Sequence, residues 1–166
     1  MLSFCQWLAD TPFSTGIRES TYIYPVIESV HVLSLCVFVG LLLLWDLRLL
    51  GITLPRIAVS EVWARLIPWI AFGAVLMVIS GLLLFASDPV RFFGNIFFRV
   101  KAVGLVLALL NALAFHLGIE RRIVEWDTPA VTPRAAKWAG GVSIALWAAI
   151  VVTGRFVAYN WFPPLV

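Results

Sequence analysis

Four long apolar stretches separated by short polar connections dominate the pattern of the chain. They cover about residues 22–45, 64–86, 99–119 and 137–159. Because an α-helix rises about 1.5 Å per residue, roughly 20 apolar residues cross the hydrocarbon core of a bilayer. The pattern therefore predicts an all-α fold, in which residues 1–166 form one domain of a polytopic membrane protein, a bundle of four transmembrane helices.

Residues 1–20 precede the first apolar stretch and mix aromatic with polar side chains. Phe4 and Trp7 lie among polar residues such as Asp10. This mixture predicts a short amphipathic helix that lies at the membrane interface. The cation of the segment, Arg18, follows its apolar residues, whereas a cleavable signal peptide begins with basic residues, so the pattern does not favour such a peptide.

Charged residues make up 13% of the chain, about half the share in a soluble domain, and the formal net charge is +3. Basic residues in a membrane protein mainly set its orientation, so this charge does not indicate a nucleic-acid partner. Most of them lie beside the connections after the first and third stretches: Arg48, Arg56, Arg65, Arg121, Arg122, Arg134 and Lys137. The positive-inside rule places these connections in the cytoplasm and, for a bacterial inner membrane, both termini in the periplasm. On the cytoplasmic side we expect Asp46 and Asp127 to form exposed pairs with arginines, which fix geometry but stabilise little.

Four ionisable side chains lie inside the apolar stretches, where charge is expensive and a functional role is the default hypothesis. Glu28 and His31 are three residues apart and so share one face of the first helix. At about 1.5 Å per residue, both fall in the half of the bilayer nearer the termini, as do Lys101 and Arg155. We predict that the four form one buried polar cluster, in which Glu28 pairs with Arg155 or Lys101. The alternative is that the two cations extend separately to the lipid head groups.

His31 is also the candidate ligand of a haem or of a metal ion. Met77, in the second stretch, lies at a similar depth and is a candidate second axial ligand. The alternation of the spans puts the other histidine, His116, about 15 Å from His31 along the membrane normal. The two axial nitrogens of one haem each lie within about 2 Å of the iron, so the histidines are not expected to share an iron. His116 remains a separate candidate for binding a cofactor.

Both histidines also have simpler explanations. His31 can hydrogen-bond Ser34, Glu28 or a tyrosine inside the bundle, and His116 can bond to the backbone of a loop at the interface. Copper or zinc binding by Glu28 and His31 stays open on chemical grounds.

Six segments resemble those of an uncharacterised family of small bacterial four-span membrane proteins. They are Glu28-Ser-Val-His31, Trp45-Asp-Leu-Arg-Leu-Leu-Gly51, Phe98-Arg-Val-Lys101, Asn111 with Phe115-His116, Trp126-Asp127, and Gly154-Arg155 with Ala158-Tyr159. This resemblance extends over nearly the whole chain, and it implies the four-span fold without an activity.

The first span, with His31 followed by Gly40 and Asp46, also resembles the histidine span of the CopD copper-resistance proteins and of HemJ-type protoporphyrinogen oxidases. The HemJ resemblance implies haem b or porphyrin chemistry, with His31 and Lys101 as the matching positions. The CopD resemblance implies the handling of copper.

Together these observations predict a small integral inner-membrane subunit that binds haem b or a related redox group, for electron transfer or for porphyrin or quinone chemistry. We expect it to contact bilayer lipid, and to associate with other membrane subunits or with a second copy of itself. Two other classes stay open: a structural or accessory subunit without a cofactor, and a metal or proton transporter. The pattern names no catalytic residue.

Overall fold

The structure is a computed structural model that describes residues 1–119, 123–127 and 132–159. Within these residues every regular element is helical. Four helical segments are long and apolar enough to cross a membrane: α3 (Ile23–Leu49), α4 (Val59–Ser87), α6 (Ile96–Ala114, continued by the π-helical turn η1, Phe115–Ile119) and α8 (Arg134–Phe156). Each overlaps one predicted stretch, so the prediction of an all-α, four-span membrane protein is confirmed.

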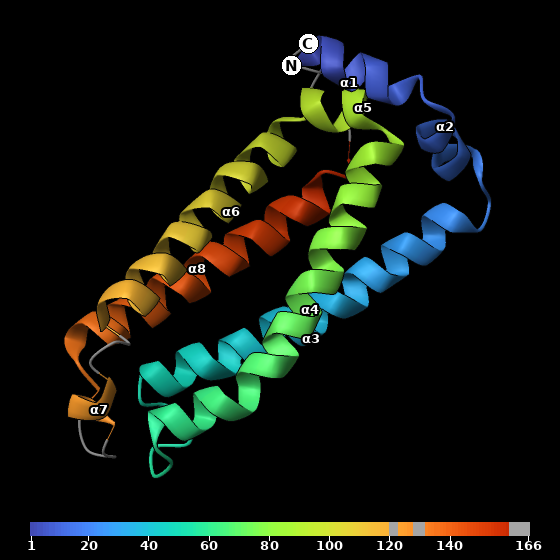
Figure 1. Cartoon of the computed structure of the whole chain (residues 1–166). Coiled ribbons are helices and arrows are strands. Elements are labelled where there is room, and N and C mark those ends of the chain that lie inside the picture. Colours follow the sequence, from blue (N-terminus) through green and yellow to red (C-terminus); the bar gives the residue numbers. More distant parts are fainter. Residues whose placement is uncertain (120–122, 128–131, 160–166) are drawn as a thin grey trace.

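Four short helices lie at the two ends of the bundle: α1 (Leu2–Ala9), α2 (Pro12–Glu19), α5 (Pro89–Gly94) and α7 (Ile123–Trp126). Figure 1 shows α1 and α5 beside each other at one end of the bundle, with α2 close by, and α7 at the opposite end. We call these ends the α5 end and the α7 end.

The N-terminal segment contains two helices rather than the one that the sequence predicts. The first ends at Ala9, and Thr11 caps the second, because its Oγ1 accepts a hydrogen bond from the backbone N–H of Ser14. Pro12 follows at the first helical position, where its missing N–H has no cost. The second helix is attached to the bundle, because the hydroxyl of Ser14 donates to the carbonyl of Ser87, the last residue of α4.

The spanning helices pack as two pairs, α3 with α4 and α6 with α8, and contacts between α3 and α8 join the pairs. Glycines allow the close approach. A Cβ added at Gly73 of α4 would lie 3.2 Å from the backbone nitrogen of Phe38 on α3. A Cβ at Gly140 of α8 would lie 3.1 Å from the carbonyl oxygen of Asp46 on α3. Small residues at helix interfaces are the usual means of tight packing in lipid.

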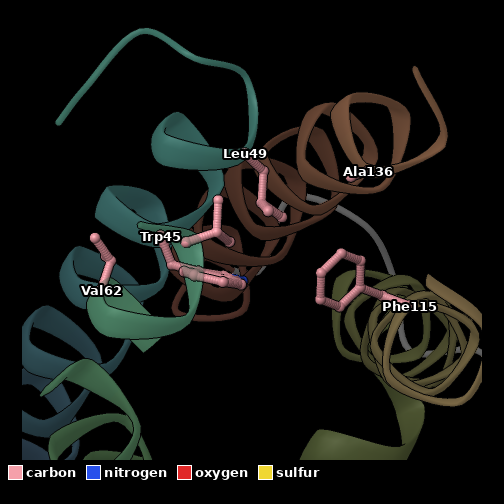
Figure 2. Close-up of a cluster of buried hydrophobic side chains, with 6 residues drawn as sticks. Trp45, Leu49, Val62, Phe115 and Ala136 are labelled. Carbon is pink, nitrogen blue, oxygen red and sulfur yellow. The ribbon is translucent and has the colours of Figure 1, made fainter. Parts of the chain in front are cut away.

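A cluster of buried hydrophobic side chains holds the α7 end together, and Figure 2 shows it in close-up. All four spanning segments contribute: Trp45 and Leu49 from α3, Val59 and Val62 from α4, Phe115 from η1 and Ala136 from α8. Along the rest of the spans most large apolar side chains are exposed. In the most apolar 18 residues of α3, only 6% are buried. Such surfaces are suited to hydrocarbon rather than to water, because lipid chains solvate apolar side chains.

Candidate functional site

His31 lies on α3 and faces α4, where its imidazole meets Ser80. The Nδ1 atom of His31 is 2.9 Å from the Oγ of Ser80. The Ser80 hydroxyl donates its own proton to the carbonyl of Leu76, at 2.6 Å, so its oxygen is left to accept from Nδ1. The network therefore assigns the proton of the neutral imidazole to Nδ1 and leaves Nε2 with a free lone pair.

Gly81, the next residue on α4, makes room for the ring of His31. A Cβ at this position would lie 3.2 Å from Cε1 and 3.7 Å from Nδ1 of His31. The dipeptide Ser80–Gly81 thus supplies both the hydrogen bond that orients the imidazole and the space that it occupies.

Lys101 approaches the same region from the other helix pair. Its stem crosses from α6 to α8, where a Cβ at Gly154 would lie 3.5 Å from Nζ. Lys101 also lies close enough to His31 to act on it electrostatically. The structure therefore brings together two of the four residues of the predicted cluster.

Glu28 and Arg155, the other two, are exposed on the surface of the chain. The guanidinium of Arg155 lies over the ring of Tyr159 on its own helix end, 5.6 Å from the ring centroid. Among the described residues the one ion pair joins Glu61 to Arg65, so the predicted pairing of Glu28 with Arg155 or Lys101 does not form.

Helix geometry explains why these two residues are exposed. One helical residue turns the side-chain direction by about 100°. Gly154 is the residue that packs against Lys101, so the side chain of the next residue, Arg155, points away from α6. Glu28 lies three residues before His31 and is rotated about 60° from the direction that faces α4.

Met77 is three residues before Ser80 on α4, and its backbone carbonyl oxygen lies 3.3 Å from the Oγ of Ser80. The same carbonyl is also within hydrogen-bonding reach of His31. Met77 therefore lies beside His31 as its depth predicts, with its backbone as the described contact.

His116 lies near the α7 end, where its ring is 5.1 Å from the ring of Trp63 at the start of α4. Trp63 and Ser80 are 17 residues apart on that helix, which is about 25 Å. His31 and His116 are thus near opposite ends of α4, so they lie too far apart to ligate one iron.

Three phenylalanines connect α4, α5 and α6 at the α5 end, and we call them the aromatic cap. The rings of Phe85 and Phe98 stack at 5.4 Å between centroids, and Phe92 lies 5.6 Å from Phe98 and 6.4 Å from Phe85. Phe85 follows Gly81 by four residues and Phe98 precedes Lys101 by three, so the cap lies about one helical turn beyond the site.

Comparison with known proteins now gives the family. The sequence model of a family of unknown function, DUF6644, matches residues 4–160. The chain belongs to this family. The match covers all four spanning segments and every candidate residue of the site. No curated protein and no solved structure matches the chain.

In this DUF6644 chain, sequence reasoning singled out His31 but missed its contacts with Ser80 and Gly81 and the contact of Lys101 with Gly154. The signal available was a serine and a glycine in adjacent positions at the depth of His31. No group of three or more His, Cys, Asp or Glu side chains that could hold a bare metal ion occurs in the described part of the chain.

At the α7 end Asp46 and its neighbour Arg48 are buried, contrary to the expectation that Asp46 forms an exposed pair with an arginine. Asp46 and Arg48 are each 3% exposed. Asp46 bonds to the hydroxyl of Ser143 on α8 rather than to an arginine. Both Nε and Nη2 of Arg48 donate to the carbonyl of Ile57, at 3.1 and 2.7 Å. Because hydrophobic packing excludes water here, both groups are satisfied by short-range hydrogen bonds.

Asp127, after α7, caps the N-terminus of α4. Its carboxylate accepts from the backbone N–H of Ser60 at 2.8 Å and from the Ser60 hydroxyl. Burial by itself raises the pKa of Asp127, but the bonds from Ser60, a further backbone bond from Val59 and the charge of Arg48 outweigh it and lower the pKa below 3.8. The carboxylate is therefore ionised at neutral pH, where it complements the positive end of the helix dipole.

Proposed function

We propose that this chain is a small integral membrane subunit that binds haem b, or a related redox-active tetrapyrrole, with His31 Nε2 as an axial ligand. The observation that carries the proposal is the hydrogen bond between Nδ1 of His31 and the hydroxyl of Ser80. Histidines that bind metals almost always donate their other ring N–H to a fixed acceptor, which sets the tautomer and raises the basicity of the ligating nitrogen.

The donor set favours haem over a bare metal ion. A porphyrin supplies four nitrogen ligands, so one histidine is enough to anchor the iron, whereas a bare Zn²⁺ or Cu²⁺ needs three or four protein ligands. A bare-metal site on His31 would therefore need ligands beyond those grouped in the described residues. When bound, haem b supplies a one-electron couple of its iron.

Helices of both pairs contribute side chains to the surroundings of His31. Lys101 reaches the region from α6, yet α6 packs mainly on α8 and has no extensive contact with α3 or α4. The aromatic cap connects α4 to α6 one turn away. Met77 is the candidate for the second axial position, because it lies on α4 beside the partner of His31.

For the location we propose a bacterial inner membrane with both termini in the periplasm. The basic residues around the α7 end support this orientation, although Arg121 and Arg122, which belong to that set, lie outside the described residues. The haem would then lie in the periplasmic half of the bilayer, where it can serve electron transfer, or porphyrin or quinone chemistry, with another membrane subunit or a second copy of the chain.

An absorption spectrum tests the proposal. The full chain, purified in mild detergent and titrated with haem, is expected to show a Soret band that shifts on reduction. His31→Ala is expected to abolish the band, and His116→Ala, the matched control near the α7 end, is expected to keep it. A chain that binds no haem, or a band that survives His31→Ala, would overturn the proposal.

A structural or accessory subunit is the second candidate, because the His31–Ser80 bond also fastens α3 to α4. On that account the chain is colourless with or without added haem. His31→Ala then lowers its thermal stability without any spectral change.

A further inference from the structure

Lys101 is a positive charge inside a span, and the described residues give it no acidic partner. It lies five residues after the start of α6, and it forms no ion pair with any described side chain. A charged side chain at membrane depth is costly and is usually paired. The acidic residue nearest in depth, Glu28, is exposed and acts electrostatically on Tyr24 rather than on Lys101.

The position of the ammonium group is defined by α8. Gly154 has no side chain, and the stem of Lys101 occupies that space, with Nζ, Cδ and Cε 3.5 to 3.8 Å from the position of the missing Cβ. A residue larger than glycine would displace this stem. The ammonium is thereby held against the backbone of α8, and it lies close enough to His31 to act on it electrostatically.

From this arrangement we infer that Lys101 binds a carboxylate of the ligand that His31 holds. The inference rests on the proposed function, because it requires a ligand at His31. A ligand held by Nε2 of His31 presents its edge to the neighbouring helices. Lys101 of α6 is the cation close to His31. Haem b carries two propionates, so a charge-assisted hydrogen bond from Lys101 to one of them gives the half-buried ammonium an acidic partner.

The inference has one main competitor. The side chain of Lys101 extends toward the α5 end, since helical side chains lean toward the N-terminus of their helix. It could therefore donate to a lipid phosphate at the interface instead of to the ligand. The two acceptors differ in one respect that can be tested: only the propionate disappears when the ligand is esterified.

The experiment compares haem b with its dimethyl ester, in which both propionates are blocked. Each is titrated into the haem-free full chain at one detergent concentration, and the dissociation constants are taken from the Soret band. The ratio of the ester constant to the haem constant is expected to be about tenfold or more in the native chain. In Lys101→Met the ratio is expected to fall to the value that detergent micelles without protein give for the two compounds. Arg155→Met, which removes an exposed cation of the neighbouring helix, is expected to keep the native ratio.

The outcomes separate the two proposals. If the native chain binds neither compound, the proposed haem function fails. If it binds both with the same affinity, His31 remains the ligand and the role of Lys101 is overturned. The ratio in the native chain decides this point even if Lys101→Met does not fold. With a folded Lys101→Met, an unchanged ratio assigns the propionate to another residue, and the inference fails.

Discussion

The Nδ1 atom of His31 lies 2.9 Å from the Oγ of Ser80, and the same hydroxyl donates to the carbonyl of Leu76 at 2.6 Å. This chain of two bonds fixes the imidazole relative to the backbone of α4. It determines which ring nitrogen is available for a ligand. The histidine comes from α3, and the two residues that orient it come from α4.

Ser80→Ala is expected to lower the affinity for haem by about 10- to 100-fold, because the outer hydrogen bond of a ligating histidine is worth that much in other metal sites. Spectrophotometric titration measures the loss. Ser29→Ala is the matched control, since the hydroxyl of Ser29 is exposed and bonds to its own helix at Pro25. Equal affinities in the two variants would contradict the role of Ser80.

Gly73→Ala is expected to force α3 and α4 apart, because its Cβ would lie 3.2 to 3.3 Å from the Cβ, N and Cα atoms of Phe38 and the two backbone atoms cannot move independently. Gly40→Ala adds the same methyl group to α3, where nothing lies within 4 Å. Both variants gain the same helix propensity, so their difference isolates the clash. Gly73→Ala should be the less stable by about 1–3 kcal/mol in reversible unfolding from detergent. Equal stabilities would mean that the helix pair is not packed this closely.

Arg48→Met is expected to destabilise the α7 end by about 1–3 kcal/mol, because it leaves the carbonyl of Ile57 without its donors in a place that excludes water. Arg65→Met provides the comparison. Arg65 forms an exposed pair with Glu61, and its loss should cost about 0–1 kcal/mol. Thermal unfolding of both variants measures the contrast, and a larger loss for Arg65→Met would show that Arg48 is not buried.

Asp127→Ala is expected to remove the cap of α4 and to lower stability by about 0.5–2 kcal/mol at neutral pH. The folded state lowers the pKa of Asp127 below 3.8. The contribution of the charge is therefore complete above that value and is lost as the pH falls through the lowered pKa of the folded state.

Unfolding of the native chain and of Asp127→Ala between pH 7 and pH 3 measures this dependence. The gap in stability should stay constant down to about pH 5 and narrow below that. Asp10→Ala, which removes an exposed carboxylate, should be as stable as the native chain at each pH. A gap that widened toward acid pH would contradict the cap.

The separation of the two histidines shows how far depth can be predicted from the sequence. The rise per residue along a helix is constant, so counting residues placed His31 and Lys101 in the same half of the bilayer and His116 in the other. In the structure Lys101 lies close enough to His31 to act on it electrostatically, whereas the ring of His116 lies beside that of Trp63 near the α7 end.

Glu28 and Arg155 were placed in the cluster by the same counting and lie on the surface instead. Counting residues gives a position along the helix axis, but it does not give the rotation of a side chain about that axis. In a span that is apolar on all sides, the sequence has no polar face to show which side meets a neighbour.

The sequence by itself determined the all-α four-span fold and the position of each polar side chain along its helix, because hydrophobic length and helical rise are local properties of the chain. Only the tertiary structure decided which side chains meet. Ser80 and Gly81 receive His31, and Gly154 receives Lys101, because contacts at glycines set the rotation of each helix against its neighbour. Such contacts join residues that are tens of positions apart, and no periodicity in a single span encodes them.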